Sequence, residues 1–153
     1  MTLNKGFTLV EILIVVIILG ILAAIVIPQF SSASNDARES ALASDLQTLR
    51  SQMELYNIQH LDQYPDVSSA NGGATWTSDG NIVARMIGKT DEYGQTGTTF
   101  GPYMQKFPTN AFNGKFDVVV EATPCAGDGS TGWHFDTSTG RLSPNDTPAH
   151  AAL

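Results

Sequence analysis

Between Gly6 and Asn35 the chain carries one charged residue, Glu11, and most other positions are large and apolar. As an α-helix the run from Phe7 to Phe30 extends over roughly 36 Å, because each residue adds about 1.5 Å. A helix of that length can cross a hydrocarbon core of roughly 30 Å. The pattern therefore predicts a membrane-spanning helix.

Beyond Phe30 the chain becomes polar but keeps a helical period. Large apolar residues recur at alternating spacings of four and three, at Leu42, Leu46, Leu49, Met53 and Tyr56. This spacing predicts an amphipathic helix whose apolar stripe faces a core. Pro65 biases Tyr64 away from helical geometry, so the helix is expected to end before that pair. We expect one continuous helix from Phe7 to about Leu61.

The remainder predicts a loop region followed by a small sheet. The segment Asp66–Asn81 is rich in Ser, Gly, Asn and Thr and reads as an irregular loop, and Ile82–Ile87 as a short helix. Three segments are expected to be extended: Lys115–Ala122, Trp133–Asp136 and Arg141–Leu142, with a turn over 137–140. We expect an antiparallel sheet packed on the apolar stripe, giving an α+β fold with a mobile tail from Pro144.

Glu11 is the residue that a plain membrane anchor does not explain. A carboxylate at the centre of a bilayer costs about 2.5 to 3.5 kcal/mol, and an ionisable residue inside such a helix indicates a functional site. Lys5 precedes the apolar run, and Asp36, Arg38 and Glu39 follow it. The positive-inside rule therefore keeps the N-terminus cytoplasmic and exports the rest.

Two simpler interpretations compete with a specialised membrane helix. A secretory signal peptide would use Lys5 as its basic region and be cleaved near Ser32-Ala33-Ser34. Its apolar core is normally about 7 to 15 residues long and uncharged, whereas this run is longer and contains Glu11. A simple anchor is the second alternative, and it leaves Glu11 without a role.

The N-terminal residues resemble a known family. Gly6-Phe7-Thr8-Leu9-Val10-Glu11, with the apolar run and Pro28, resembles the start of type IV pilins and of type II secretion pseudopilins. A second segment, from Gly101 to Gly114, looks like the corresponding part of major pseudopilins. In that segment Ala111 replaces the family's usual proline.

The resemblance implies a maturation and assembly pathway. A prepilin peptidase would cut after Gly6 and methylate the new amine of Phe7. Glu11 would then pair with the Phe7 amine of a neighbouring subunit, although the two residues are four apart and a pair within one chain competes. Gly20 and Pro28 would bound a stretch that loses helicity on assembly, and a simple kink at Pro28 is the alternative.

The expected organisation follows from both lines of reasoning. Residues 1–6 are a leader, 7–30 a transmembrane and assembly helix, 31–64 an amphipathic half, and 65–153 a globular region that forms one domain with 31–64. We expect a single-pass inner-membrane protein whose globular part is periplasmic or extracellular. The resemblance implies that its partners are further copies in a helical filament, prepilin peptidase, an inner-membrane assembly platform and minor pilins or pseudopilins.

Composition narrows the functional class. The formal net charge is -7 at pH 7, which argues against nucleic-acid binding by the globular part, because phosphate recognition needs clustered Lys and Arg. Cys125 is the one cysteine and excludes a disulfide within the chain. Many type IV pilins close their C-terminal loop with such a bond, so its absence favours a pseudopilin.

Neither a catalytic centre nor a firm cofactor site is predicted. His60, His134 and His150 stand in unrelated contexts without metal-ligand spacing, and we expect no enzymatic activity. Major pseudopilins resembling this chain often bind calcium, for which the weak candidates are Asp117, Glu121, Asp128 and Asp136. Solvated loop carboxylates are the favoured alternative, and we treat the sequon Asn145-Asp146-Thr147 as chance.

These observations favour a structural protein, a pseudopilin of a type II secretion-like system, polymerised through its N-terminal helix. A type IV pilus pilin, used in adhesion, motility or DNA uptake, is the alternative within the same chemistry. A membrane-anchored binding module, recognising a ligand through the loop from Asp66 to Thr99, is the alternative of another class.

Overall fold

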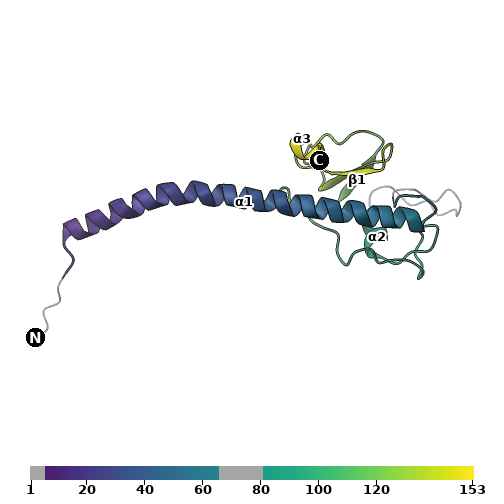
Figure 1. Cartoon of the computed structure of the whole chain (residues 1–153), viewed down its shortest axis with the longest axis horizontal. Coiled ribbons are helices and arrows are strands. Elements are labelled where there is room, and N and C mark those ends of the chain that lie inside the picture. The colour runs from purple at the N-terminus through teal and green to yellow at the C-terminus, as the bar shows by residue number, and fades with distance from the viewer. Residues whose placement is uncertain (1–5, 66–80) are drawn as a thin grey trace, which may run out of the picture. The chain divides into compact units, whose positions relative to one another are not determined.

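A computed structural model describes residues 6–65 and 81–153 of the chain. The chain divides into two compact units, residues 1–38 and residues 39–153, which are considered separately. The elements in order are α1 (Leu9–Gln59), α2 (Asn81–Ile87), β1 (Val118–Glu121), β2 (Trp133–Asp136), β3 (Arg141–Pro144) and α3 (Pro148–Ala151), as Figure 1 shows. The fold is α+β and pilin-like, as predicted.

Helix α1 confirms the predicted long helix to within two residues at each end. It spans 51 residues from Leu9 to Gln59 and is uninterrupted at position 28, where Pro28 lies. It ends where Leu61 and Asp62 both take left-handed φ angles of 57° and 58°. The Asp62 N–H donates to the Asn57 carbonyl at 3.0 Å, which satisfies one of the last helix carbonyls.

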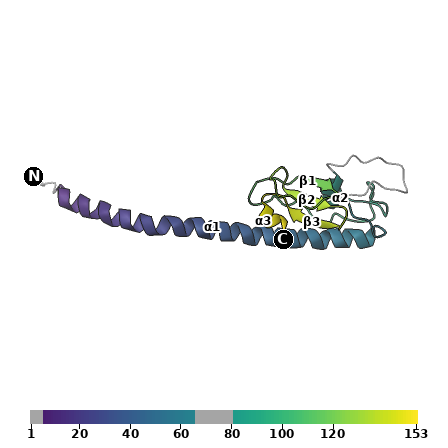
Figure 2. The same cartoon turned by 90° about the horizontal axis from the view of Figure 1, so that it is seen from above.

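The apolar stripe of α1 carries the core of the second unit, as its spacing predicts. Helix α2 adds Ile82 and Met86, and alternate strand positions supply the other face. Figures 1 and 2 show the sheet beside the second half of α1, and Figure 2 shows β3 as the strand nearest to it. The buried core consists of Leu42, Leu46, Leu49, Met53, Tyr56, Ile82, Met86, Phe107, Val118, Trp133, Phe135 and Leu142.

The sheet is mixed, so the prediction of an antiparallel sheet is wrong for one of its two pairings. In the order β1-β2-β3, β1 pairs with β2 in parallel and β2 pairs with β3 antiparallel. A parallel pairing needs a crossover of about a dozen residues, and segment 122–132 supplies it. Lys115 Nζ donates to the carbonyls of Gly129 and Ser130, at 2.8 and 2.7 Å, so this crossover returns to the start of β1.

The turn between β2 and β3 lies where the sequence predicts it, over 137–140. Gly140 takes a φ of 68°, a left-handed conformation that favours glycine. A Cβ at this position would lie 2.6 Å from the ring of Tyr64. The turn therefore needs glycine both for its backbone and for its close approach to the segment after α1.

The C-terminal tail is ordered, contrary to the expectation that it is mobile. Thr147 caps α3 by accepting a hydrogen bond from the His150 N–H, and Pro148 occupies the first helical turn. Arg50 and Arg141 both donate to the carbonyl of Leu153, at 3.1 and 2.6 Å. Side chains from α1 and β3 thus fix the C-terminal tail, although its polar composition predicts that it is mobile. The predicted loop from Asp66 to Asn81 falls outside the described residues, apart from Asn81.

Candidate assembly site

The N-terminus of α1 is closed by a reciprocal pair of hydrogen bonds between Thr8 and Glu11. The Thr8 N–H and hydroxyl each donate to Glu11 Oε2 at 3.0 Å. In return the Glu11 N–H approaches Thr8 Oγ1 at 3.3 Å. This is a capping box, in which a threonine at the N-cap and a glutamate three residues later satisfy free N–H groups of the first turn.

Sequence reasoning missed Thr8 as a partner of Glu11. The signal was present, because Thr8-Leu9-Val10-Glu11 has the capping-box spacing of a threonine followed three residues later by glutamate. In the unprocessed chain the carboxylate is therefore occupied locally. Phe7, the other proposed partner, lies two residues before the start of α1. Its side chain is 82% exposed.

The first unit presents an apolar surface without a covering layer from its own chain. Every described side chain between Phe7 and Phe30 is exposed. By length and composition α1 could cross a membrane, with a mean hydropathy of 3.3 over its most apolar 18-residue window. Such a surface requires lipid or other apolar helices around it, because its exposure to water is unfavourable.

Gly20 lies in this surface without a structural reason inside the chain. A Cβ built on it would meet no atom within 4 Å. Glycine in a helix interior costs about 1 kcal/mol relative to alanine. The packing of the described residues therefore does not account for Gly20, and a Cβ built on Gly6 would likewise meet no atom within 4 Å.

The four weak calcium candidates lie in separate hydrogen-bonding arrangements. Asp117 Oδ1 accepts from the Gly132 N–H at 3.1 Å, and Asp128 Oδ1 accepts from the Ser130 N–H at 2.9 Å. Asp136 accepts from Ser138 and Thr139 in the β2–β3 turn. Over residues 6–65 and 81–153 no three His, Cys, Asp or Glu side chains are placed to hold a metal ion.

Hydrogen bonding favours the ionised form of two of these carboxylates. The side chain and backbone of Ser130 lower the pKa of Asp128, and the Ser138 side chain is the main cause that lowers the pKa of Asp136. Glu121 is exposed and accepts from the Thr123 hydroxyl at 3.1 Å. These partners act within their own turns, where they shape the backbone.

Asn145 joins the loops of the C-terminal region. Its Nδ2 donates to Asp128 Oδ1, Ser130 Oγ and Thr131 Oγ1 at 2.8 to 3.2 Å, and the residue is 2% exposed. The amide nitrogen of the sequon is therefore buried and hydrogen-bonded, which agrees with treating that tripeptide as chance.

The three histidines remain apart, as the sequence predicts, and each has a different environment. His60 is buried at the end of α1 between Tyr56 and Thr90. His134 is buried on β2, with Nε2 3.9 Å from Glu121 Oε2. His150 Nδ1 lies 2.5 Å from Asp146 Oδ2. No two of them share a site.

Cys125 is a half-buried thiol with two nearby hydrogen-bond acceptors. Its Sγ donates to the Pro144 carbonyl at 3.3 Å and lies 3.4 Å from Asn145 Oδ1. Burial is the main cause that raises the pKa of this thiol, so the less reactive, protonated form is favoured.

Comparisons with known proteins find relatives of this chain that share its N-terminal sequence motif. A family model described as the prokaryotic N-terminal methylation motif matches residues 1–27. The type II secretion system core protein G of Pseudomonas aeruginosa is 26% identical over 120 residues, covering 78% of this chain and 76% of that protein. The core protein G of Klebsiella pneumoniae is 24% identical over 145 residues, covering 95% and 88%.

A pilus protein is also similar. The type IV narrow pilus major component PilA5 of Thermus thermophilus is 35% identical over 85 residues, covering 50% of this chain and 72% of that protein. No solved structure gives a significant match.

Proposed function

We propose that this chain is a pilin-like filament subunit, similar to type IV pilins and type II secretion pseudopilins, which is processed after Gly6 and polymerises through α1. The relatives and the methylation motif support a pilin-type filament subunit with a single apolar membrane helix. The proposal adds cleavage of residues 1–6 by a prepilin peptidase, methylation of the Phe7 amine and assembly on an inner-membrane platform with minor subunits.

The observation that carries the proposal is one carboxylate in the exposed apolar half of α1. Glu11 is the charged residue of a surface that needs apolar neighbours. When α1 leaves lipid for a bundle of its copies, that surface stays away from water. A desolvated carboxylate in the bundle is stabilised by an opposite charge, which the Phe7 amine supplies once residues 1–6 are removed.

The capping box gives the proposed pair a defined competitor. Thr8 already donates two hydrogen bonds to Glu11 Oε2 in the unprocessed chain. Cleavage turns the peptide nitrogen of Phe7 into a charged amine one residue before Thr8. We propose that the carboxylate then exchanges part of this local bonding for the amine of a neighbouring copy.

Of the two filament types, we propose the secretion pseudopilin. Two core protein G relatives align over 78% and 95% of this chain, and Cys125 is a free cysteine. A type IV pilus subunit is the second candidate, supported by the Thermus relative, which is 35% identical over 85 residues. Loss of protein secretion in a deletion strain with intact surface pili supports the first, and the opposite phenotype supports the second.

Mass spectrometry of the mature N-terminus tests processing. We expect the membrane-extracted protein to begin at a methylated Phe7, and Gly6→Leu to remain at the precursor mass because the peptidase needs a small residue at the cleavage position. A conservative Gly6→Ala variant serves as the matched control and should be cleaved at least in part. A mature chain beginning near Ser34 would instead establish a signal peptide.

Electron microscopy of filaments from cells that overexpress the chain tests assembly. We expect Glu11→Ala to insert in the membrane normally and to reduce filament yield at least tenfold, because the desolvated amine loses its charge partner. Thr8→Val removes the hydroxyl of the capping box but keeps the carboxylate. If the intermolecular pair dominates, this variant assembles; if the local bonding is what assembly needs, it fails like Glu11→Ala.

Normal filament yield from Glu11→Ala contradicts the pairing. A processed chain that stays monomeric under conditions of overexpression favours the membrane-anchored binding module.

A further inference from the structure

The second half of α1 carries a regular row of residues on the face opposite the core. The members of this outer row are Ser44, Thr48, Ser51, Leu55 and Ile58, which alternate in spacing between four and three. Each lies two positions after a residue of the buried stripe, and two positions correspond to about 200° around an α-helix. All five residues are exposed. The outer row therefore faces away from the core of its own chain.

The outer row contains no charged residue, although the same part of the helix carries several beside it. From position 39 to position 59 the charged residues are Glu39, Asp45, Arg50 and Glu54. Arg50 donates to the Leu142 carbonyl at 2.7 Å. Glu54 accepts from the Tyr64 hydroxyl at 2.9 Å. A solvent-facing helix surface normally carries charges, whereas depletion of charge is typical of the centre of a protein interface.

The side chains of the outer row also suit a covered position. Leu55 is 41% exposed and Ile58, one turn further on, is 72% exposed. Removing these two apolar side chains from water is favourable. The Thr48 hydroxyl donates to the Ser44 carbonyl at 2.9 Å, so this polar group keeps its hydrogen bond when another molecule covers it.

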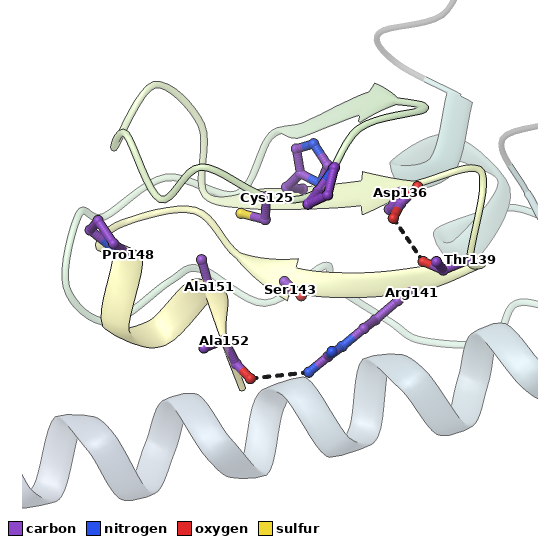
Figure 3. A pocket seen from close by; sticks show the side chains of 10 residues that line it. Cys125, Asp136, Thr139, Arg141, Ser143, Pro148, Ala151 and Ala152 are labelled. Atoms are coloured by element: carbon purple, nitrogen blue, oxygen red, sulfur yellow. Dashed lines mark hydrogen bonds between the residues drawn. The ribbon is translucent and has the colours of Figure 1, made fainter.

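The cavity that Figure 3 shows is a weaker candidate for a contact with a partner. It has a volume of about 400 Å³ and lies between Ser143 of β3, α3 and Pro124. Its carboxylate, Asp136, accepts from a hydroxyl of its own turn at 2.8 Å, and Arg141 donates to the Ala152 carbonyl at 3.2 Å. The charged side chains of the cavity are thus engaged within the chain.

We infer that the outer row packs against the apolar first half of α1 of a second copy, an inference that rests on the proposed function. A row that alternates between four and three has a mean spacing of about 3.5 residues, the repeat that keeps one helix facing another. Rows of this kind form the ridges that fit into the grooves of a partner helix. The spacing therefore selects a helix as the occupant.

Charge and hydropathy select which helix it is. Each copy has a formal net charge of -7 at pH 7, so copies repel one another, and the uncharged outer row is where a second copy can approach at least cost. The first half of α1 exposes apolar side chains on every side and needs apolar neighbours outside its own chain. Copies staggered along a filament bring the first half of one α1 beside the outer row of another.

A charge placed in the outer row tests the inference by filament yield in electron microscopy. We expect Ser51→Glu to lower the yield at least about tenfold, because the contact would bury an unpaired carboxylate. Ala43→Glu is the matched control, since Ala43 is exposed on the same helix but belongs to neither row, and it should keep the parental yield. Both variants should melt within about 2 °C of the parent in detergent, because both sites are exposed in the single chain.

Photo-crosslinking identifies the occupant of the outer row. Filaments grown from a mixture of isotopically light and heavy copies would carry a photoreactive residue at Ser51 in the light copies. After trypsin digestion we expect the light Ser51 peptide to be joined to the heavy peptide of residues 7–38. A heavy peptide from residues 86–153 in its place overturns the inference.

The yields separate failure of the inference from failure of the proposed function. Parental filament yield from Ser51→Glu, or an equal loss of yield from Ser51→Glu and Ala43→Glu, overturns the inference and leaves the proposed function intact. A processed parent chain that forms no filaments overturns both, because the second copy is then absent.

Discussion

His60, at the end of α1, illustrates how single polar residues are accommodated in the second unit. Its Nδ1 lies 2.8 Å from the Tyr56 carbonyl and its Nε2 lies 2.9 Å from the Thr90 hydroxyl. A carbonyl only accepts, so Nδ1 carries the proton, and Nε2 accepts from Thr90 in the neutral ring. The ring also stacks on Tyr56 at 3.7 Å between centroids. Both bonds and the stacking therefore suit neutral His60.

Acidification should destabilise the second unit through this residue. Burial is the main cause that lowers the pKa of His60 in the folded chain, so the unfolded chain, with an ordinary pKa of about 6.5, binds the proton more readily. The stabilisation is present above pH 6.5 and is lost as the pH falls below it. We expect the melting temperature of the full chain in detergent to fall between pH 7 and pH 5.

His60→Gln is the test of that assignment. The variant should be less stable at pH 7 but should show a flatter dependence on pH across this interval, because it has no ring to protonate. Parallel curves for the parent and His60→Gln would assign the effect to other groups.

At the scale of elements, α1 meets two different surroundings along one backbone. Its first half exposes apolar side chains on every side, whereas its second half buries one stripe and leaves the other faces wet. The difference arises from the spacing of the apolar residues, which are continuous up to Ile27 and periodic from Leu42. A continuous apolar helix needs an apolar environment all round, and a periodic one needs a single partner surface.

Replacing a leucine of the buried stripe by alanine should therefore lower the free energy of unfolding strongly. Replacing a leucine outside the stripe should lower it little. Leu49 is fully buried and Leu55, one and a half turns further on, is 41% exposed. We expect Leu49→Ala to lower the free energy of unfolding by about 2 to 5 kcal/mol, the range for buried leucines that leave a cavity. Leu55→Ala should cost less than about 1 kcal/mol, as measured by urea denaturation. Similar losses for both would mean that the stripe does not bear the core.

At the scale of the whole molecule, the C-terminal region is held by side chains that bond to backbone. Lys115 binds two carbonyls of the 122–132 crossover, Arg50 donates two hydrogen bonds to the Leu142 carbonyl, and Asn110 Nδ2 donates to the Gly132 carbonyl. A sheet of three four-residue strands has few ladder bonds of its own. These hydrogen bonds therefore connect the sheet, the tail and the second half of α1.

Removal of divalent cations should leave this unit intact. Lys115 places its ammonium against the carbonyls of the crossover, and the candidate carboxylates are engaged in separate hydrogen bonds. We therefore expect EDTA or millimolar calcium to shift the melting temperature by less than about 1 °C. Lys115→Met should lower it by several degrees, because two carbonyls lose a charged donor. A rise of more than about 5 °C with calcium would establish a calcium site, since a ligand that binds the folded state stabilises it.

The sequence determined those features that depend on neighbouring residues along the chain. The period of the apolar residues located both halves of α1 and the core stripe, and β-branched runs and turn residues located β1, β2 and β3 to within a few positions. The motif from Gly6 to Glu11 predicted the similarity to pilins and pseudopilins that the relatives bear out. The spacing of the Thr8–Glu11 capping box is local too, so the sequence also contains that signal.

Only the tertiary structure decided which distant groups meet. The parallel pairing of β1 depends on how the crossover folds back onto Lys115, and the ordered tail depends on Arg50 and Arg141, which are far from Leu153 along the chain. The cavity beside Ser143 likewise arises from β3, α3 and the Pro124 segment together. Contacts between residues tens of positions apart leave no periodic trace in the sequence, because they are fixed by packing of the whole unit and not by the local backbone.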